Sequence, residues 1–477
     1  MKVLFAAAEG SPFYKVGGLG DVTYALPKAL QALGVDMRVV LPYYSHLFPE
    51  RYRDQVHDVA HFSLDFGGRA VYVGIKSMQL DAVPVYFIDN EEFFGREQLY
   101  GEWDDGGRFG FFQLAIIEML QVIDWIPDIL HANDWHTAMI PVLLEEKYAW
   151  IAPYAKIKTQ LTIHNLQFQG VFPESVLDTV FGIGRRYFNE TGFAKDGAVN
   201  YLKGGIDFAD VVSTVSPSYA QEIQQPFWGE GLDAALRSRG AQLKGILNGI
   251  DPDLYNPATD QAIAATYSAT ALQGKATDKQ DLQRLFQLPE KDQPVFGMVT
   301  RLTRQKGVDL VIAALQAQLQ QLGAQVIILG TGDPDLENQL LALQPQFPDQ
   351  LRVRLAFDET IARKIYAGAD FFLMPSAFEP SGLSQMMAMR YGTIPIVHET
   401  GGLRDSVTAY DDTTGIGTGY SFWDFRAEVL GQLMHQASVD YTQNQAKYRS
   451  MQGQAMAQDF SWDQAARQYL AGYRALI

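Results

Sequence analysis

Two stretches decide the fold of this 477-residue chain: Lys15–Asp21, which reads KVGGLGD, and Glu379–Gln385, which reads EPSGLSQ. They follow the apolar runs Val3–Ala8 and Phe371–Met374. A strand, a glycine-rich turn and a helix start together present backbone N–H groups and the positive end of the helix dipole to an anion. One such loop is weak evidence. Two loops in separate halves, with cationic residues nearby, predict a diphosphate bound in a cleft between two α/β domains.

Short apolar runs alternate with helical patterns along the chain, which is typical of parallel α/β sheets. Helices are expected over 19–33, 109–122 and 308–322. A turn-rich segment, 246–252, separates two series of strands and predicts an interdomain hinge. A last helix is expected from Ser461 to Tyr473. The expected strands are Val3–Ala7, Met37–Leu41, Val83–Ile88, Ile129–His131, Gln160–Ile163 and Val211–Val215, and then Val295–Thr300, Val326–Leu329, Val353–Ala356, Phe371–Met374 and Ile394–Val397.

The composition excludes several classes of protein. The net charge is −17, with 38 basic against 55 acidic residues, which argues against a general affinity for nucleic acid. No stretch approaches the ~20 apolar residues that span a bilayer. The chain has no cysteine, so disulfides, thiolate catalysis and Cys-ligated metals are excluded. The absence of a leader at the start predicts a cytoplasmic protein.

Three further loops follow expected strands and carry candidate binding residues. Arg301 and Lys306 bracket a helix start at the carboxyl end of a strand, where ligands bind in open α/β sheets, and together they favour anion binding. Arg304 is interpreted as a surface charge. Gly330–Pro334 and Thr400–Asp405 make the same sheet edge glycine-rich.

Single residues in these loops leave alternatives open. Glu379 could hydrogen-bond a sugar, or it could only favour a helix N-terminus. His131, Asp134, His136 and His164 follow strands of the first half, but no further ligand cluster is evident nearby, so a metal site is disfavoured. Sugar rings could pack on aromatic residues of these loops, which could equally be core residues; they are Tyr14, Trp135 and Phe168.

Taken together, the motifs resemble the bacterial glycogen synthase and plant starch synthase family. They occur in the family's order and cover essentially the whole chain. The resemblance rests on Lys15–Val22, His131–Ala138, Thr162–Leu166, Leu202–Ile206, Ser213–Pro217, Ile246–Asp251, Arg301–Thr303, Gln305–Gly307, Glu379–Gln385 and Thr400–Leu403.

The resemblance implies a fold of the α/β class, with two Rossmann-like domains of the GT-B type that face each other across a deep cleft. The expected boundaries are 1–245 for the acceptor-side domain, 246–455 for the nucleotide-sugar domain, and 456–477 for a helix that crosses back to the first domain. The implied activity is transfer of glucose from ADP-glucose to the non-reducing end of an α-1,4-glucan, with retention of configuration. No cofactor and no metal are expected, and the sequence does not give the oligomeric state.

The resemblance also assigns roles to single residues. The catalytic group comprises Glu379, Arg301, Lys306 and His164. The donor-binding group comprises Lys15, Gly18, Asn248, Gly330, Phe357, Gly382, Leu383 and Ser384. The acceptor side comprises Glu9, Asp21 and Asp134.

The chain departs from related enzymes at two positions. Met387 stands where many related enzymes carry a second Glu that contacts the ribose, although this family commonly lacks it. Phe357 stands where relatives often have a Tyr that stacks on adenine.

Three alternatives stay open: a related glucosyltransferase that uses UDP-glucose or a small acceptor, a pyridoxal-phosphate-dependent glucan phosphorylase, and a non-catalytic sugar-binding protein.

Overall fold

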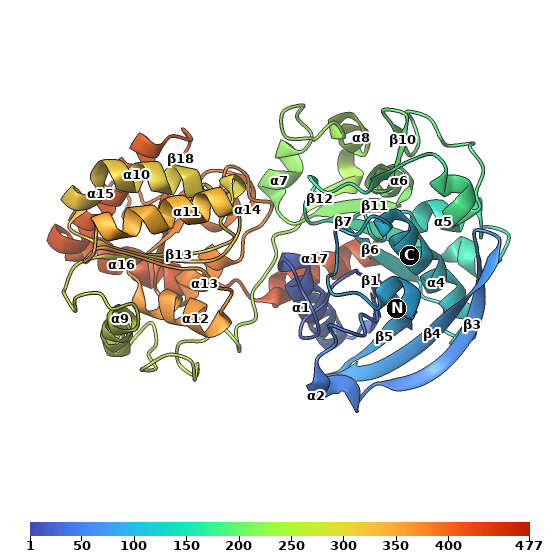
Figure 1. The fold of residues 1–477 in the computed structure, drawn as a ribbon, viewed down its shortest axis with the longest axis horizontal. Helices are drawn as coiled ribbons and strands as arrows, with labels where there is room; N and C mark the ends of the chain where they lie inside the picture. The colour runs from blue at the N-terminus through green and yellow to red at the C-terminus, as the bar shows by residue number, and fades with distance from the viewer. The chain divides into compact units, whose positions relative to one another are not determined.

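The computed structural model describes residues 1–477, which divide into two compact units (Figure 1). Unit 1 contains Met1–Asn248 together with Trp462–Ile477, and unit 2 contains Gly249–Ser461. The chain therefore leaves unit 1 after Asn248 and re-enters it at Trp462. The domain boundaries that the sequence analysis placed after residues 245 and 455 stay predictions. No helix is both long enough and apolar enough to cross a membrane.

Unit 1 is built on a nine-stranded sheet in the order β12-β11-β7-β6-β1-β2-β5-β4-β3. The strands from β12 to β5 pair in parallel, whereas β3 and β4 are antiparallel. A separate small sheet has the order β8-β10-β9. The strands are β1 (Lys2–Ala6), β2 (Asp36–Pro42), β3 (His57–Phe66), β4 (Arg69–Leu80), β5 (Val83–Asp89), β6 (Ile129–Asn133), β7 (Lys158–Ile163), β8 (Val171–Phe172), β9 (Ala194–Lys195), β10 (Ala198–Asn200), β11 (Val211–Thr214) and β12 (Leu243–Gly245).

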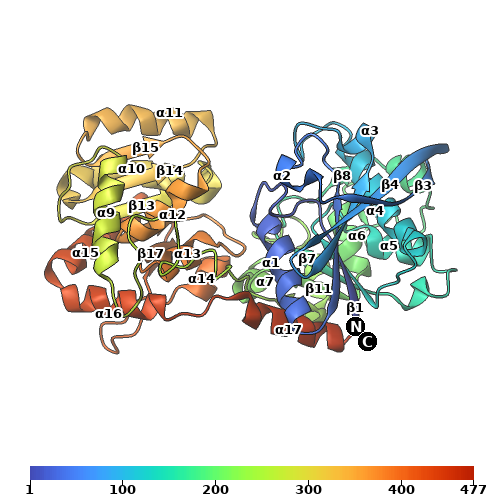
Figure 2. The ribbon, with the colours of Figure 1, turned by 90° about the horizontal axis from the view of Figure 1, so that it is seen from below.

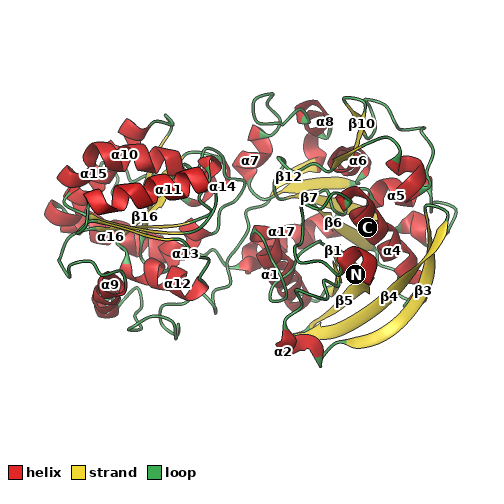
Figure 3. Cartoon of the chain, in the orientation of Figure 1, coloured by secondary structure: helices red, strands yellow, loops and turns green.

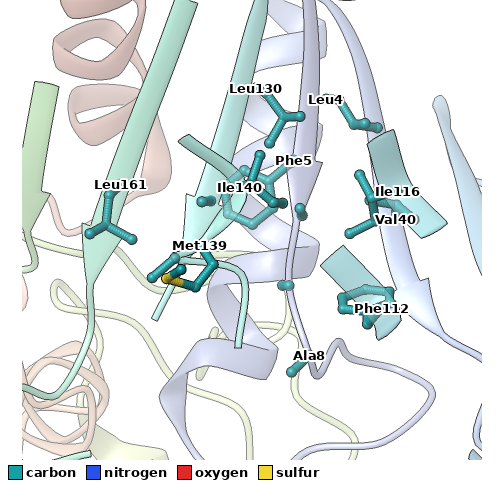
Figure 4. Close-up of a cluster of buried hydrophobic side chains, with 14 of the residues drawn as sticks. Leu4, Phe5, Ala8, Val40, Phe112, Ile116, Leu130, Met139, Ile140 and Leu161 are labelled. Carbon is teal, nitrogen blue, oxygen red and sulfur yellow. The ribbon is translucent and has the colours of Figure 1, made fainter. Parts of the chain in front are cut away.

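Helices lie on both faces of the large sheet, as Figures 2 and 3 show. The core between them is apolar and fully buried: side chains of β1, β2, β6 and β7 meet those of α4 and α5 (Figure 4). The helices of unit 1 are α1 (Gly18–Ala32), α2 (Glu50–Arg53), α3 (Glu91–Phe94), α4 (Asp105–Val122), α5 (Ile140–Glu146), α6 (Tyr201–Phe208), α7 (Pro217–Glu222), α8 (Asp233–Ser238) and α17 (Trp462–Arg474), with short 3₁₀ or π turns at Tyr154–Lys156, Leu177–Phe181 and Gly240–Gln242.

Unit 2 is built on a six-stranded parallel sheet in the order β15-β14-β13-β16-β17-β18. Helices α10, α11 and α15 cover one face, and α9, α12, α13 and α16 cover the other (Figure 1). The strands are β13 (Val295–Val299), β14 (Gln325–Leu329), β15 (Leu351–Arg354), β16 (Phe371–Met374), β17 (Ile394–His398) and β18 (Tyr420–Phe422). The helices are α9 (Gln273–Leu285), α10 (Val308–Leu322), α11 (Pro334–Leu343), α12 (Glu359–Gly368), α13 (Ser384–Arg390), α14 (Gly401–Ser406), α15 (Ala427–Gln443) and α16 (Gln445–Met456), with 3₁₀ turns at Arg304–Lys306 and Gln344–Gln346.

Both parallel sheets reverse their winding at one point. In unit 1 the chain proceeds outward from β1 through β2 and β5, and then from β6 through β7, β11 and β12, so the reversal lies between β1 and β6. In unit 2 it lies between β13 and β16. Ligands of open α/β sheets bind beyond the carboxyl ends of the strands at such a point. The predicted α/β fold is confirmed, and the candidate site loops lie at these two edges.

The hairpin of β3 and β4 was not among the elements predicted from the sequence, and one strand was predicted two residues too late. The hairpin turns at Gly67 and Gly68, both with positive φ (61° and 79°), which is the pairing that two-residue hairpins favour. A Gly-Gly pair between alternating segments could have indicated it. The strand expected at 353–356 is observed at Leu351–Arg354, because its outer positions carry arginines that mask the apolar pattern.

The terminal helix α17 is fastened to unit 1 through a buried histidine, in keeping with its expected return to the first unit. His131 on β6 hydrogen-bonds Tyr473 Oη through Nδ1 (2.6 Å) and Thr162 Oγ1 through Nε2 (2.6 Å). Neither His131 nor Tyr473 is exposed to solvent. Burial lowers the pKa of His131 to about 3, so the ring is neutral. A residue that resembled a metal ligand in the sequence therefore anchors the C-terminus.

We expect Tyr473→Phe to destabilise the protein by about 1–3 kcal/mol, because it leaves a buried ring nitrogen without a partner. The measurement is the midpoint of urea unfolding, followed by circular dichroism. Tyr72→Phe on β4 is the control, since Tyr72 is 54% exposed. Equal midpoints for the Tyr473 and Tyr72 variants would show that the His131 contact does not hold the helix.

Candidate active site

At the sheet reversal of unit 2, two loops bring a cation and a carboxylate into contact. Lys306 lies after β13 and Glu379 after β16, and Lys306 Nζ donates to Glu379 Oε2 over 2.6 Å. The side chains are only 15% and 7% exposed, respectively. Ser376 Oγ donates to the same carboxylate oxygen (3.0 Å). Both hydrogen bonds go to Oε2, so Oε1 of Glu379 is left for another donor.

The backbone holds these two loops together. Gly307 has a φ of +69°, and a Cβ there would lie 2.0 Å from the carbonyl oxygen of Pro375. The backbone N–H of Ala377 donates to the carbonyl of Gln305 (2.8 Å). Glycine is therefore required after Lys306 for the loops to approach, and the ion pair forms as a consequence of that approach.

Arg301 and Arg304 differ in their ion pairing, although they lie only three residues apart in the same loop. Arg304 forms ion pairs with Asp309 (3.4 Å) and Asp335 (3.8 Å), in agreement with its interpretation as a surface charge. The exposed Arg301 has no ion-pair partner. The exposed, unpaired guanidinium of Arg301 leaves this sheet edge with a cation that an anionic ligand can use.

The loop between β16 and α13 supplies backbone donors at the same edge. Gly382 has a φ of +68°, and the N–H groups of Gly382, Leu383 and Ser384 make no hydrogen bond within the protein. These three residues are half-buried. The second glycine loop of the sequence therefore offers free N–H groups near Lys306, as an anion-binding loop requires.

The first glycine loop behaves differently, because a side chain of the protein occupies it. The carboxylate of Glu9 accepts from the N–H groups of Val16 (2.8 Å), Gly17 (3.3 Å) and Gly20 (3.0 Å). Burial raises the pKa of Glu9 above its ordinary value. Beside it, Lys15 pairs with Asp21 (2.9 Å). Three donors predicted to face a phosphate are thus already engaged, which the sequence pattern did not reveal.

A second carboxylate, Asp134, lies at the sheet reversal of unit 1. Its Oδ1 accepts from the backbone N–H of His164 (2.7 Å), and its backbone has a φ of +54°, which Asp and Asn tolerate best. Burial, reinforced by the negative charge of Glu9, raises the pKa of Asp134 to about 7. Two carboxylates of the predicted acceptor side therefore interact electrostatically.

The tautomer of His164 follows from its neighbour Asn133. The Asn133 amide nitrogen donates to the carbonyls of Ala6 (3.0 Å) and His131 (3.4 Å), so its oxygen faces His164 Nε2 at 2.9 Å. Nε2 must then carry the proton, which leaves Nδ1 as an acceptor. Burial lowers the pKa of His164 to about 3. At neutral pH His164 is therefore an uncharged hydrogen-bonding group and not a general acid.

The remaining candidates lie in different surroundings. Asn248 is the last residue of unit 1 in that stretch, and its buried Oδ1 has no partner. Gly330 follows β14 so closely against Thr300 that a Cβ would lie 1.8 Å from the Thr300 oxygen. Phe357, after β15, is 81% exposed. Gly18 is the first residue of α1.

The aromatic and histidine candidates divide between core and surface. Tyr14 is buried and donates to the carbonyl of Pro42. Trp135 and His136 pack against each other with ring centroids 4.0 Å apart, whereas Phe168 is 54% exposed. No group of three or more His, Asp or Glu side chains is arranged to hold a metal ion.

Comparison with known proteins identifies the family to which this chain belongs. The starch synthase catalytic domain family matches residues 2–238, and the family of glycosyl transferases group 1 matches residues 279–452. The chain is 61% identical over 477 residues to the glycogen synthase of Lacticaseibacillus casei, covering 100% of this chain and 99% of that protein. The chain belongs to the glycogen synthase and starch synthase family. It is a glycosyltransferase.

Further relatives in this family include the glycogen synthase of Lactiplantibacillus plantarum, which is 56% identical over 476 residues, with coverage of 100% and 99%. Among solved structures, the catalytic domain of starch synthase IV from Arabidopsis thaliana, bound to ADP and acarbose, superimposes with a TM-score of 0.92. It is 36% identical, and the match covers 100% of this chain and 99% of that one. The predicted family, the GT-B fold and the enzyme class are confirmed.

Several residues that contact the candidate site residues were not singled out from the sequence. Ser376 hydrogen-bonds Glu379, and Asn133 hydrogen-bonds His164. Gln385 hydrogen-bonds the loop after β16. Gln385 belongs to the glycine-rich motif Glu379–Gln385. The signal for such residues was weak, because a polar residue in a loop motif does not reveal which neighbour it supports.

We expect Asp134→Asn to stabilise the protein above pH 7. The folded carboxyl keeps its proton up to about pH 7, whereas the unfolded one loses it near its ordinary pKa of about 3.9. The folded state therefore loses stability as the pH rises through this range, and the amide removes that cost. The gain should be at least about 1 kcal/mol at pH 8 and smaller at pH 5.

Thermal unfolding at the two pH values measures this effect. Asp124→Asn is the matched control, because Asp124 also has a positive φ (48°) but is exposed. A gain of equal size at pH 5 and pH 8 would contradict the raised pKa of Asp134.

Proposed function

We propose that this chain transfers glucose from ADP-glucose to the non-reducing end of an α-1,4-glucan, with retention of anomeric configuration. The observation that carries the proposal is the ion pair of Lys306 with Glu379, at the same sheet edge as the unpaired Arg301 and the free N–H groups of the loop after β16. Its substrates are supported by the relatives named glycogen synthase and by the starch synthase solved with ADP and acarbose.

In this proposal the cations bind the leaving group. When the bond between the anomeric carbon and ADP breaks, negative charge grows on the diphosphate, and preorganised cations stabilise it most at that moment. We assign this role to Arg301 and Lys306, and we assign the distal phosphate to the N–H groups of Gly382, Leu383 and Ser384. Gly330 allows the donor to approach the backbone closely. On the family resemblance, Lys15 and Gly18 also contact the donor.

Glu379, His164 and Asn248 address the glucosyl ring. Glu379 keeps one carboxylate oxygen without a hydrogen bond, and a carboxylate supports the positive charge that develops at the anomeric centre. The neutral His164 offers Nδ1 as an acceptor for a sugar hydroxyl, and the buried oxygen of Asn248 offers another. The acceptor side is assigned to Glu9, Asp21 and Asp134.

The displacement needs no separate catalytic base. The acceptor hydroxyl attacks from the side of the leaving group, its proton passes to the departing phosphate, and the new glycosidic bond keeps the original configuration. This route agrees with a histidine that is neutral and a Glu379 that is paired with a lysine. The family resemblance implies that no metal is needed, so we expect activity to survive chelation.

The decisive experiment supplies glycogen with labelled ADP-glucose and UDP-glucose in parallel. We expect transfer from ADP-glucose to exceed that from UDP-glucose, and label to be released by a glucosidase specific for α-1,4 bonds. A preference for UDP-glucose, or transfer only to a small acceptor, would overturn the proposed substrates. Absence of transfer from either donor would overturn the activity.

The same assay tests the cations. Arg301→Ala and Lys306→Ala should each lower kcat by about 10²–10³, the scale for losing one preorganised charge stabiliser. Arg304→Ala is the matched control in the same loop, since Arg304 pairs with surface carboxylates. Near-normal turnover in both the Arg301 and Lys306 variants would refute their role.

Phe357 provides a test of the donor base. If its exposed ring stacks on adenine, Phe357→Ala should raise KM for ADP-glucose more than it lowers kcat, because stacking acts in ground and transition states alike. One lost stack is worth about 1–3 kcal/mol, and Phe357→Tyr should be nearly neutral. Phe227→Ala is the control, as Phe227 is also 81% exposed but belongs to unit 1. An unchanged KM would place the base elsewhere.

A further inference from the structure

Gln385 is a completely buried glutamine in α13 that binds the loop preceding its own helix. Its amide nitrogen donates to the carbonyls of Ser381 (3.1 Å) and Gly382 (3.1 Å) and to the hydroxyl of Ser406 (2.9 Å). None of these contacts serves the core of the sheet. The side chain instead links the loop after β16 to the end of α14.

The contact with Ser406 extends to Glu379 through α14. Ser406 Oγ donates to the carbonyl of Gly402 (2.6 Å), and the N–H of Gly402 donates to the carbonyl of Glu379 (3.0 Å). The segment from Glu379 to Gly382 is therefore held at both ends, once by Gly402 and once by Gln385. This arrangement restricts the loop without using any group that faces a ligand.

Peptide geometry gives the contacts of Gln385 a direct consequence. In a planar trans peptide the C=O and the following N–H point in opposite directions. Gln385 holds the C=O groups of Ser381 and Gly382 toward itself, so the N–H groups of Gly382 and Leu383 point away from it. Those N–H groups are two of the three that make no hydrogen bond within the protein.

We propose that Gln385 is a positioning residue that presets the N–H groups of Gly382 and Leu383 for the distal phosphate of the donor. The inference rests on the proposed function, because it takes a nucleoside diphosphate as the ligand. Without the amide donor, both peptides can rotate, and ligand binding must then supply the order that Gln385 provides in advance.

The test compares ADP with AMP, which lacks the distal phosphate, by calorimetric titration of the full chain. Gln385→Met keeps the length of the side chain and removes the donor. We expect its affinity for ADP to fall about 10-fold, the scale of one to two lost hydrogen bonds, while its affinity for AMP stays within about 2-fold. The kcat for transfer should fall as well, because charge grows on the same phosphate.

Gln452→Met is the matched control, since Gln452 is equally buried in unit 2 and donates to the carbonyl of Gly392 (2.7 Å). It should lower the melting temperature and leave the ratio of ADP to AMP affinity unchanged. If Gln385→Met does not fold, Ser406→Ala tests the same chain of contacts. It removes one link and should weaken ADP binding about 2–5-fold without a change for AMP.

The outcomes separate this inference from the proposed function. Equal losses of ADP and AMP affinity, or no loss of either, in a protein that still transfers glucose from ADP-glucose would overturn the role of Gln385 alone. A wild-type protein that neither prefers ADP over AMP nor uses ADP-glucose would overturn the proposed function, and the role of Gln385 with it.

Discussion

The buried ion pair between Lys306 and Glu379 joins the two loops at which the sheet of unit 2 reverses its winding. Removing two charges from water is costly, and only close contact with further hydrogen bonds offsets that cost. Ser376 and the tight approach of Gly307 to Pro375 provide those conditions. The other features of this edge, the unpaired Arg301 and the free N–H groups after β16, depend on the loop positions that the pair requires.

The sheet reversal of unit 1 carries buried carboxylates without a cation, unlike the reversal of unit 2. Glu9 and Asp134 are both buried and acidic, and no cation pairs with either carboxylate. Backbone N–H groups carry their hydrogen bonds instead, and the pKa of each is raised. Glu9 thereby acts as the internal anion of the first glycine loop. The two glycine loops consequently differ in their free donors: Glu9 engages three N–H groups of the first, whereas the N–H groups of Gly382, Leu383 and Ser384 in the second make no hydrogen bond within the protein.

Much of the fold could be predicted because periodicity is local. The helix at Val308–Leu322 and the strand at Phe371–Met374 are observed with the expected limits. The β3–β4 hairpin was missed, since polar and charged residues interrupt the apolar residues along both of its strands. Histidines were the least predictable group, because His131 is structural and His164 belongs to the candidate site, although both follow buried strands.

By itself, the sequence determined the class of fold, the family and the residue types at the strand ends, because strand patterns and glycine motifs are written in neighbouring residues. Only the tertiary structure decided which groups are partnered. The Lys306–Glu379 pair joins residues 73 positions apart, and His131 meets Tyr473 across 342 positions. Such contacts depend on strand order and on the burial of both partners. Neither of these can be determined from a short stretch of sequence. For the same reason, the sequence could not show that Glu9 accepts hydrogen bonds from the first glycine loop, whereas the loop after β16 keeps free N–H groups.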